Sequence, residues 1–444
     1  EGFAKESDAL LANLAKGKTP VTIPAVEKAL LEAAKKCIPK GKRDRRTPMW
    51  TPAMEEADAL YAQAHANELY GPGDDPALMS HTLAAKQQRD ETFRSERQRV
   101  FKDTLASLAT HDCGRVWDII RATSRNSRFD GAVLTDEDGV KHTTRKRQAA
   151  ALAKQYADVA TRAPDSRAPK KVWTNGRTFN AFTWDEWKNS LEHAKSNKAP
   201  GPDDITADFV KKVPATGQQV ILKAINRTLE TGDVPESWRR GEIIPLLKPG
   251  KPADKLKSYR PVTLTAHLCK LTERMVLQRV LYSVGDKMHE AQFGFRAGRS
   301  TLDAIARLMQ VVTDEVNTYE RYRQPDGMYR IKLRRAASVL VDFSSAFDTI
   351  DHDMAIKRLK ELGVEAFELR WIRNFLTGRR NWVSVDGIKS KPRQFTAGVP
   401  QGTVLGPMIF ILAVDSLLER LSGIDKLHQV AYADDLTITA FGRH

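Results

Sequence analysis

The sequence predicts an α+β fold with more than one lobe. Three observations support this prediction. The chain has 444 residues, which is too long for one ordinary hydrophobic core, and its hydrophobic content of 41% is sufficient to build more than one. From Ile243 onward, short β-prone runs alternate with segments of helical periodicity.

The overall charge indicates the class of partner. A formal net charge of +15 favours a polyanion, either nucleic acid or anionic lipid. The longest apolar stretch, residues 403–414, is well short of the ~20 residues that cross a bilayer, so we expect no membrane span. The chain begins without Met and without a signal-peptide pattern, which we interpret as a cut or internal start of a protein that is not secreted.

The cysteines exclude two further classes of protein. Cys37, Cys113 and Cys269 lie far apart and have no partners at zinc-site spacing. We therefore expect neither a disulfide framework nor a zinc finger. The three side chains are interpreted as small hydrophobic residues in a reducing compartment.

The first 180 residues are predicted to be mainly helical and basic. Apolar residues recur at helical spacing over residues 25–38, and residues 77–110 contain neither Pro nor Gly. The Asp138-Gly139 pair predicts a hairpin, which a helix over residues 145–159 follows. The basic segment 39–46 is equally consistent with a phosphate-contacting loop and with a solvated linker.

A composition break over residues 161–177 is the best candidate for a lobe boundary. Thr183 and Glu186 then form the sequence signature of a capping box that opens a helix through His193. The later elements are predicted as two strands and three helices: strands 243–247 and 338–343, and helices 266–282, 301–316 and 353–362.

Two segments carry candidate catalytic carboxylates. The apolar run that begins at Ser338 ends on Asp342, and Asp434-Asp435 interrupts two β-prone runs as the turn of a predicted hairpin. Each segment alone also fits an ordinary strand end or turn. If the strands pair, three carboxylates meet at one sheet edge, where they repel one another unless cations bind. Mg²⁺ prefers such oxygen ligands, and two ions suit nucleotidyl transfer.

The order of motifs extends this interpretation. Asp342 with Ala346-Phe347, residues 397–407 (AGVPQGTVLGP) and residues 432–435 (YADD) resemble the three palm motifs of reverse transcriptases. Upstream, residues 198–203 (KAPGPD), 258–264 (SYRPVTL) and 292–301 (QFGFRAGRST) are similar to segments of the same family. The resemblance covers about residues 183–440 and points to the non-LTR (LINE-type) retrotransposon group, and within it to trypanosomatid ingi-like members.

The resemblance assigns roles to individual residues. Asp342, Asp434 and Asp435 correspond to the metal-binding triad, with the backbone carbonyl of Phe343 as a further ligand. Phe347 occupies the position of a ring that clashes with a 2′-hydroxyl and so favours deoxynucleotides. The remaining assignments are residues that contact the nucleotide (Lys248, Lys251, Arg260, Gln401 and Gly402) and residues that hold template backbone (Arg296 and Arg299).

The resemblance implies a right-hand polymerase. We expect a helical extension over residues 1–180, fingers over 181–337 and an incomplete, ferredoxin-like palm over 338–444, with the thumb absent. The implied reaction extends a DNA primer on an RNA template with deoxynucleotides and two Mg²⁺ ions, Mn²⁺ being the alternative metal. The implied setting is the nucleus, in a ribonucleoprotein with the element's own RNA.

Two rival interpretations stay open. The chain could be a retired polymerase that serves as an RNA-binding scaffold, although decay commonly removes the metal ligands first. It could instead be an RNA-synthesising polymerase, which Phe347 opposes. The basic, tyrosine-containing segment 320–335 is interpreted either as a surface on which bases stack or as a disordered insertion.

Overall fold

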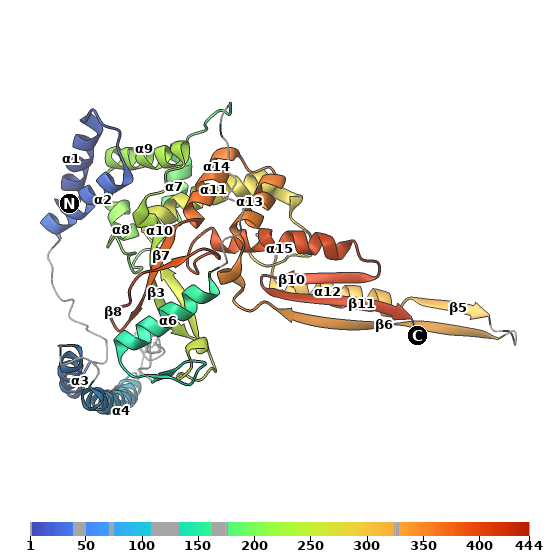
Figure 1. The fold of residues 1–444 in the computed structure, drawn as a ribbon, viewed down its shortest axis with the longest axis horizontal. Coiled ribbons are helices and arrows are strands. Elements are labelled where there is room, and N and C mark those ends of the chain that lie inside the picture. The colour runs from blue at the N-terminus through green and yellow to red at the C-terminus, as the bar shows by residue number, and fades with distance from the viewer. Residues whose placement is uncertain are drawn as a thin grey trace.

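The computed structural model describes residues 2–38, 50–70, 75–107, 133–161, 174, 176–323, 325 and 328–443. Helices dominate the N-terminal part, and helices and strands alternate in the C-terminal part (Figure 1). The mixed α+β class predicted from the sequence is therefore confirmed. None of the helices in these residues combines the length and the apolar character that spanning a membrane requires.

Within the described residues, five helices belong to the N-terminal extension, and a short hairpin, β1 (Leu134–Thr135) and β2 (Lys141–His142), precedes the last of them. The helices are α1 (Gly2–Lys16), α2 (Ile23–Cys37), α3 (Pro52–Tyr70), α4 (Pro76–Ser107) and α6 (Arg145–Val159). The predictions of a helix near residues 25–38, of the Asp138-Gly139 hairpin and of helix 145–159 are confirmed. The basic segment 39–46 and most of the boundary segment 161–177 lie outside the described residues.

The remaining helices surround two sheets. They are α7 (Trp184–Glu192), α8 (Ala207–Lys212), α9 (Ala215–Thr231), α10 (Glu236–Arg239), α11 (His267–Val284), α12 (Thr301–Val316), α13 (His352–Glu361), α14 (Ala366–Leu376) and α15 (Gly406–Ser422), with 3₁₀ turns η1 (Leu256–Ser258), η2 (Gly285–Lys287) and η3 (Ala346–Thr349). Thr183 and Glu186 form both hydrogen bonds of the predicted capping box at α7.

The first large sheet joins strands that are far apart in the sequence. Its order is β4 (Tyr259–Leu264), β3 (Arg240–Leu247), β7 (Arg379–Val385) and β8 (Ile388–Lys389), and β9 (Arg393–Phe395) also pairs with β7. β3 is antiparallel to β4 and parallel to β7. This sheet therefore combines strands from both sides of residue 338.

The second large sheet is antiparallel, in the order β10 (Leu427–Tyr432), β11 (Asp435–Arg443), β6 (Tyr329–Asp342) and β5 (Tyr319–Arg323). The predicted strand 338–343 is the end of the longer β6, and Phe343 lies just beyond it. Residues 319–323 pair with 329–333, so the backbone of the segment interpreted as a disordered insertion is an ordered hairpin. This hairpin projects away from the helical body (Figure 1).

The largest hydrophobic core lies among the helices. Helices α1 and α2 pack against α9, so part of the N-terminal extension shares this core with the later helices. Trp187, Trp238 and Trp371 are fully buried in it. A smaller core packs α6 against the β3–β7 sheet, and a third, small one between α15 and the β10–β11 hairpin contains Leu418, Ala431 and Leu436.

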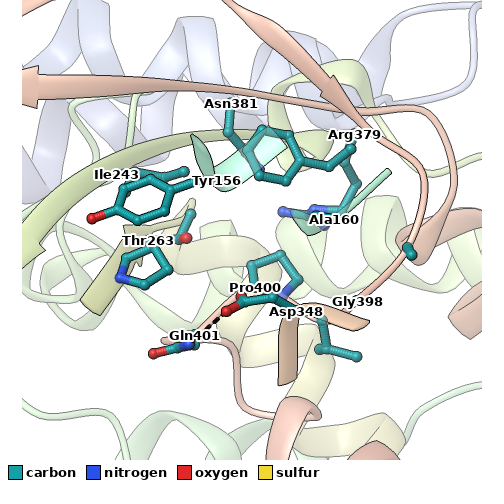
Figure 2. Close-up of a pocket in the computed structure, with 14 residues that line it drawn as sticks. Tyr156, Ala160, Ile243, Thr263, Asp348, Arg379, Asn381, Gly398, Pro400 and Gln401 are labelled. Carbon is teal, nitrogen blue, oxygen red and sulfur yellow. Dashed lines mark hydrogen bonds between the residues drawn. The ribbon is translucent and has the colours of Figure 1, made fainter. Parts of the chain in front are cut away.

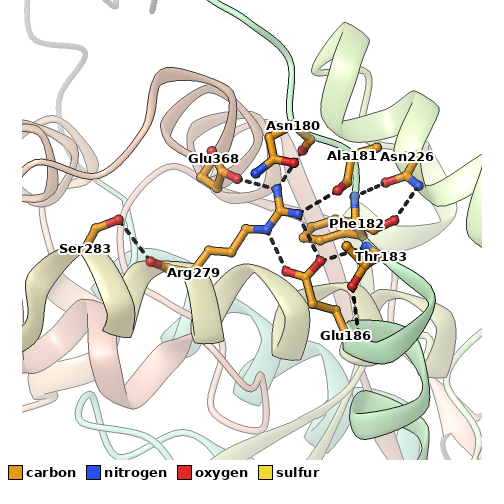
Figure 3. Close-up of polar contacts among 9 residues, drawn as sticks. All are labelled: Asn180, Ala181, Phe182, Thr183, Glu186, Asn226, Arg279, Ser283 and Glu368. Carbon is orange, nitrogen blue, oxygen red and sulfur yellow. Dashed lines mark hydrogen bonds and ion pairs between the residues drawn. The ribbon is translucent and has the colours of Figure 1, made fainter.

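Arg279 on α11 connects three segments of the helical body (Figure 3). Its guanidinium donates to both carboxylate oxygens of Glu186, at 2.7 and 3.0 Å, and to Glu368 on α14 at 3.0 Å. It also donates to the backbone carbonyls of Asn180 and Ala181, at 2.7 and 2.8 Å. Because its guanidinium bonds to all of these groups at once, this one side chain holds the start of α7, and the residues just before it, against α11 and α14.

Candidate active site

The two carboxylate segments meet at one sheet end, and the predicted hairpin is present with its turn one residue earlier than Asp434-Asp435. β10 and β11 form a hairpin whose turn is Ala433-Asp434, and Asp435 begins β11. Asp435 lies directly opposite Asp342 on β6. Side chains at directly opposed positions of an antiparallel pair have Cβ atoms roughly 5 Å apart. Two carboxylates therefore share one sheet end, and Asp434 lies on the adjoining turn.

The donor set at this end of the sheet has the chemistry of a magnesium site. Asp342 and Asp435 are exposed, and Asp434 is half-buried. None of the three forms an ion pair with a Lys, Arg or His of the described residues. Opposed like charges repel, and a hard divalent cation would offset that repulsion. Among all the residues that the structure describes, no three His, Cys, Asp or Glu side chains lie close enough together to form a preformed metal centre.

Two phenylalanines follow Asp342. Phe343 is half-buried and contacts the helical core and the small core under β10–β11. Phe347, on η3, is also half-buried, and its ring lies 4.9 Å from that of Phe410 and 6.4 Å, edge-on, from that of Phe295. Phe347 is therefore partly a core residue, while its accessible part leaves the predicted contact with a sugar open.

The loop that carries Gln401 and Gly402 is held against β4. The amide of Thr263 donates to the carbonyl of Gln401 at 2.7 Å. Gly402 has a φ of 118°, and a Cβ there would lie 2.6 Å from the carbonyl oxygen of Thr263. Glycine is required at this position for both reasons. The Gln401 side chain in turn donates to the carboxylate of Asp348 at 3.2 Å (Figure 2).

Asp348 is a site residue to which sequence reasoning assigned no role. Burial raises its pKa to about 6, against the lowering effects of the hydrogen bond from Gln401 and of the nearby charge of Lys248. The signal that could have revealed it is its place directly after Ala346-Phe347 in the first palm motif. The charge of Lys248, a residue predicted to contact the nucleotide, therefore acts on the same carboxylate that accepts a hydrogen bond from Gln401.

The other predicted phosphate-contacting residues lie on the β3–β4 hairpin. Arg260 is exposed on β4, opposite Leu246 on β3. Lys248 and Lys251 lie in the connecting turn, where the amide of Lys251 donates to the carbonyl of Lys248 at 3.2 Å. Basic side chains at such a hairpin tip are available to phosphate groups, and their predicted role stays a prediction.

Arg296 and Arg299 have partners within their own loop. Arg296 donates to the carbonyl of His289 at 2.9 Å, and Arg299 donates to that of Gln292 at 3.1 Å and to that of Glu290. Both guanidinium groups thus shape the segment between η2 and α12. Their predicted contact with template backbone is not tested by this arrangement and stays a prediction.

The N-terminal extension also reaches the nucleotide-binding loop, which the sequence did not indicate. The carbonyl of Ala160, at the end of α6, accepts from the amides of Thr396 and Ala397 at 3.0 and 2.8 Å. Tyr156 of α6 lines the small pocket behind Gln401 and Asp348 (Figure 2). The helix therefore supports the start of the AGVPQG segment from outside.

These features define a class of site: acidic residues at a sheet end beside a glycine-containing loop and a basic hairpin, as expected of a nucleotidyl-transfer centre. Comparison with protein families indicates which kind of nucleotidyl-transfer enzyme this site resembles. Residues 246–444 match the family model described as reverse transcriptase (RNA-dependent DNA polymerase). Residues 246–444 are therefore similar to a reverse transcriptase domain, the class of nucleotidyltransferase that this family model describes.

Individual relatives have consistent names. The chain is 31% identical over 266 residues to the RNA-directed DNA polymerase from mobile element jockey of Drosophila melanogaster, a match that covers 59% of this chain and 27% of that protein. It is 31% identical over 349 residues to a putative 115 kDa protein in type-1 retrotransposable element R1DM of the same species, covering 77% and 31%.

A third relative is the probable RNA-directed DNA polymerase from transposon BS of Drosophila melanogaster, which is 28% identical over 260 residues. That match covers 57% of this chain and 27% of the relative. The chain thus spans about a quarter to a third of the length of these three curated relatives. The domain assignment accordingly applies to the matched residues.

Proposed function

We propose that this protein is an RNA-directed DNA polymerase of a non-LTR retrotransposon that extends a DNA 3′-end on an RNA template. The observation that supports the proposal most strongly is the pairing of Asp342 with Asp435, with Asp434 on the adjoining turn. Nucleotidyl transfer needs carboxylates at one point to hold divalent cations against the reacting phosphate. The relatives named as RNA-directed DNA polymerases support the same activity.

In this proposal the two large sheets are the fingers and the palm. The β3–β4 hairpin, with Arg260, Lys248 and Lys251, is the fingers surface that would bind the triphosphate. The β10–β11–β6 sheet would be the palm, with its carboxylate end toward the nucleotide. Gln401 and Gly402 lie where backbone approaches closely, which suits contact with the nucleotide or template.

The three carboxylates would hold two Mg²⁺ ions, with Mn²⁺ as the alternative, and the Phe343 carbonyl would add a ligand. When bound, the metal supplies charge stabilisation for the attacking and leaving oxygens. The chain's own residues position the substrate: Arg260 can pair bidentately with phosphate, and the accessible part of the Phe347 ring would exclude a 2′-hydroxyl. Discrimination against ribonucleotides then follows from shape.

The cellular setting is part of the same proposal. Two of the relatives are named as products of a mobile element and a retrotransposable element. We infer an RNA template, a DNA primer and deoxynucleotides as partners, and a ribonucleoprotein with the element's RNA. A nuclear location and an ingi-like subgroup are inferred from the sequence resemblance alone.

Primer extension tests the proposal. The chain, an RNA template with an annealed DNA primer, Mg²⁺ and deoxynucleotides are compared with the same mixture containing Asp434→Asn. We expect extension by the parent and none by the variant. Absence of extension by the parent, with tight RNA binding retained, would instead favour the RNA-binding scaffold. Extension with ribonucleotides in place of deoxynucleotides would favour the RNA-synthesising polymerase.

A further inference from the structure

The turn that carries Asp434 is held from outside its own sheet. Gln292, in the loop between η2 and α12, is only 1% exposed, and its side-chain amide lies against Ala433. Its Oε1 accepts from the amide of Ala433 at 3.0 Å, and its Nε2 donates to the carbonyl of Ala433 at 3.4 Å. One side chain therefore satisfies both backbone groups of the residue that precedes Asp434.

Backbone contacts continue this attachment along β10. The amide of Ala431 donates to the carbonyl of Ala291, and the amide of Phe293 donates to the carbonyl of Ala431, both at 2.8 Å. At Gly294 the fit is closer still, since a Cβ there would lie 2.2 Å from the amide nitrogen of Ala433. The segment 291–294 thus runs beside the end of β10, joined to it by an isolated parallel bridge between Gln292 and Ala431.

The turn has a conformation that needs such support. Ala433 has a φ of 55°, in the left-handed region that residues with a Cβ rarely adopt. Conformations of this kind persist where the surroundings over-determine them, and they occur frequently at functional sites. Without the amide of Gln292, both polar groups of a buried residue would lose their partners.

The loop that presents Gln292 is itself anchored. The amide of His289 donates to the carboxylate of Asp415 on α15 at 2.7 Å, and Asp415 also pairs with the buried Arg358. Gly294 donates its amide to Oε1 of Gln292 at 2.8 Å, which fixes the side-chain orientation. A continuous set of hydrogen bonds therefore connects α15 of the helical body, through the loop of Gln292, to the Ala433-Asp434 turn.

We propose that Gln292 is a positioning residue that holds the Ala433-Asp434 turn so that Asp434 and Asp435 face Asp342 as metal ligands. This inference rests on the proposed polymerase function, and it assigns a role to a residue that sequence reasoning included only as part of the QFGFRAGRST motif. A purely structural role would lower stability alone. A positioning role also changes how the carboxylates bind a divalent cation.

The test uses the full chain with Gln292→Met, which keeps the side-chain length and removes the amide. Gln429→Met is the matched control, because Gln429 lies on β10, the strand that leads into the turn, and its amide donates to the carbonyl of Leu418 on α15 at 3.1 Å, away from the turn. Three quantities are measured: hydrogen exchange at the Ala433 amide, Mn²⁺ binding to the protein alone, and the Mg²⁺ concentration that half-saturates primer extension.

For Gln292→Met we expect faster exchange at Ala433 and about tenfold weaker Mn²⁺ binding, as found for residues that orient metal ligands. The Mg²⁺ requirement should rise by a similar factor, while the KM for deoxynucleotide stays near the parent value. Gln429→Met should change none of these, although both variants lower the unfolding midpoint.

Unchanged exchange and unchanged Mn²⁺ binding in Gln292→Met would overturn the inference, as would equal effects of both variants on Mn²⁺ binding. The binding and exchange measurements need no turnover. A parent that fails to extend a primer would therefore reject the polymerase proposal, while these two measurements still decide the role of Gln292.

Discussion

The helical body and the β10–β11–β6 sheet differ in how they are held together. The helical body buries three tryptophans and contains the half-buried, multiply bonded Arg279, whereas the core under the hairpin has only three buried side chains among the described residues, Leu418, Ala431 and Leu436. The sheet exposes Val339 and Leu340 to 61% and 81%. The comparison indicates that stability resides mainly in the helices, while the candidate chemistry lies on a lightly packed sheet positioned by contacts from outside.

The largest expected effect is a loss of activity without a loss of stability when a carboxylate of the sheet is changed. Replacing Asp342 with Asn removes one charge from the carboxylate end, and primer extension should fall on the order of 10³-fold or more. Because Asp342 is exposed, the urea midpoint of unfolding should stay close to that of the parent.

Asp425→Asn is the control for charge removal. Asp425 precedes β10 at the end of the strand opposite the turn, and its side chain is 90% exposed. Extension should be unaffected by this change. A comparable loss of activity in both variants would show that Asp342→Asn acts by changing the net charge of the protein and not by removing a metal ligand.

The second effect concerns the helical body. Arg279→Ala leaves Glu368, whose side chain is 6% exposed, without its cation, and the free energy of unfolding should fall by about 3 kcal/mol. Arg240→Ala breaks an exposed pair with Glu236 and should cost less than about 1 kcal/mol. Urea denaturation measures both values. Equal losses would contradict the assignment of stability to this contact.

A third prediction concerns Phe347, a residue of the helical body that follows Asp342 closely in the chain. Phe347→Ala removes the ring that contacts Phe410 and, in our proposal, the sugar, so discrimination between deoxynucleotides and ribonucleotides should fall about tenfold. Phe295→Ala removes only the edge-on contact to Phe347 and should preserve discrimination. Single-nucleotide incorporation kinetics give both ratios. If Phe347→Ala still discriminated between the two kinds of nucleotide, the Phe347 ring would have no role in selecting the sugar.

The smallest effect is a pH dependence of stability. Burial raises the pKa of Asp348 from 3.8 to about 6, so between these values the folded state holds a proton that the unfolded chain has released. Stability therefore falls as pH rises through this window. In Asp348→Asn, which keeps a partner for Gln401, the fall between pH 4 and pH 6 should be smaller. An identical pH profile in both proteins would contradict the assignment.

Local signals predicted much of this structure. The apolar run before Asp342 and the β-prone runs around Asp434-Asp435 predicted strands, and the sequence left their pairing as a condition that the register of Asp342 with Asp435 meets. The capping box at Thr183 and the turn at Asp138-Gly139 could also be predicted, because the residues that form each of them are neighbours in the chain.

Long-range contacts left no such signal. The parallel pairing of β3 with β7, the support of Ala397 by α6 and the contact of Gln292 with Ala433 each join segments more than a hundred residues apart. Arg296 and Arg299 show that a short-range contact can also be missed, because sequence alone does not reveal that their guanidinium groups donate to carbonyls of their own loop.

The most direct test of the central claim measures activity and stability on one pair of proteins. Primer extension with saturating Mg²⁺ and urea unfolding are compared for the parent and Asp435→Asn, which alters the residue opposite Asp342. Our account predicts that extension is lost and the unfolding midpoint is retained. Retained extension, or a midpoint that falls together with activity, would contradict the assignment of chemistry to the sheet and stability to the helices.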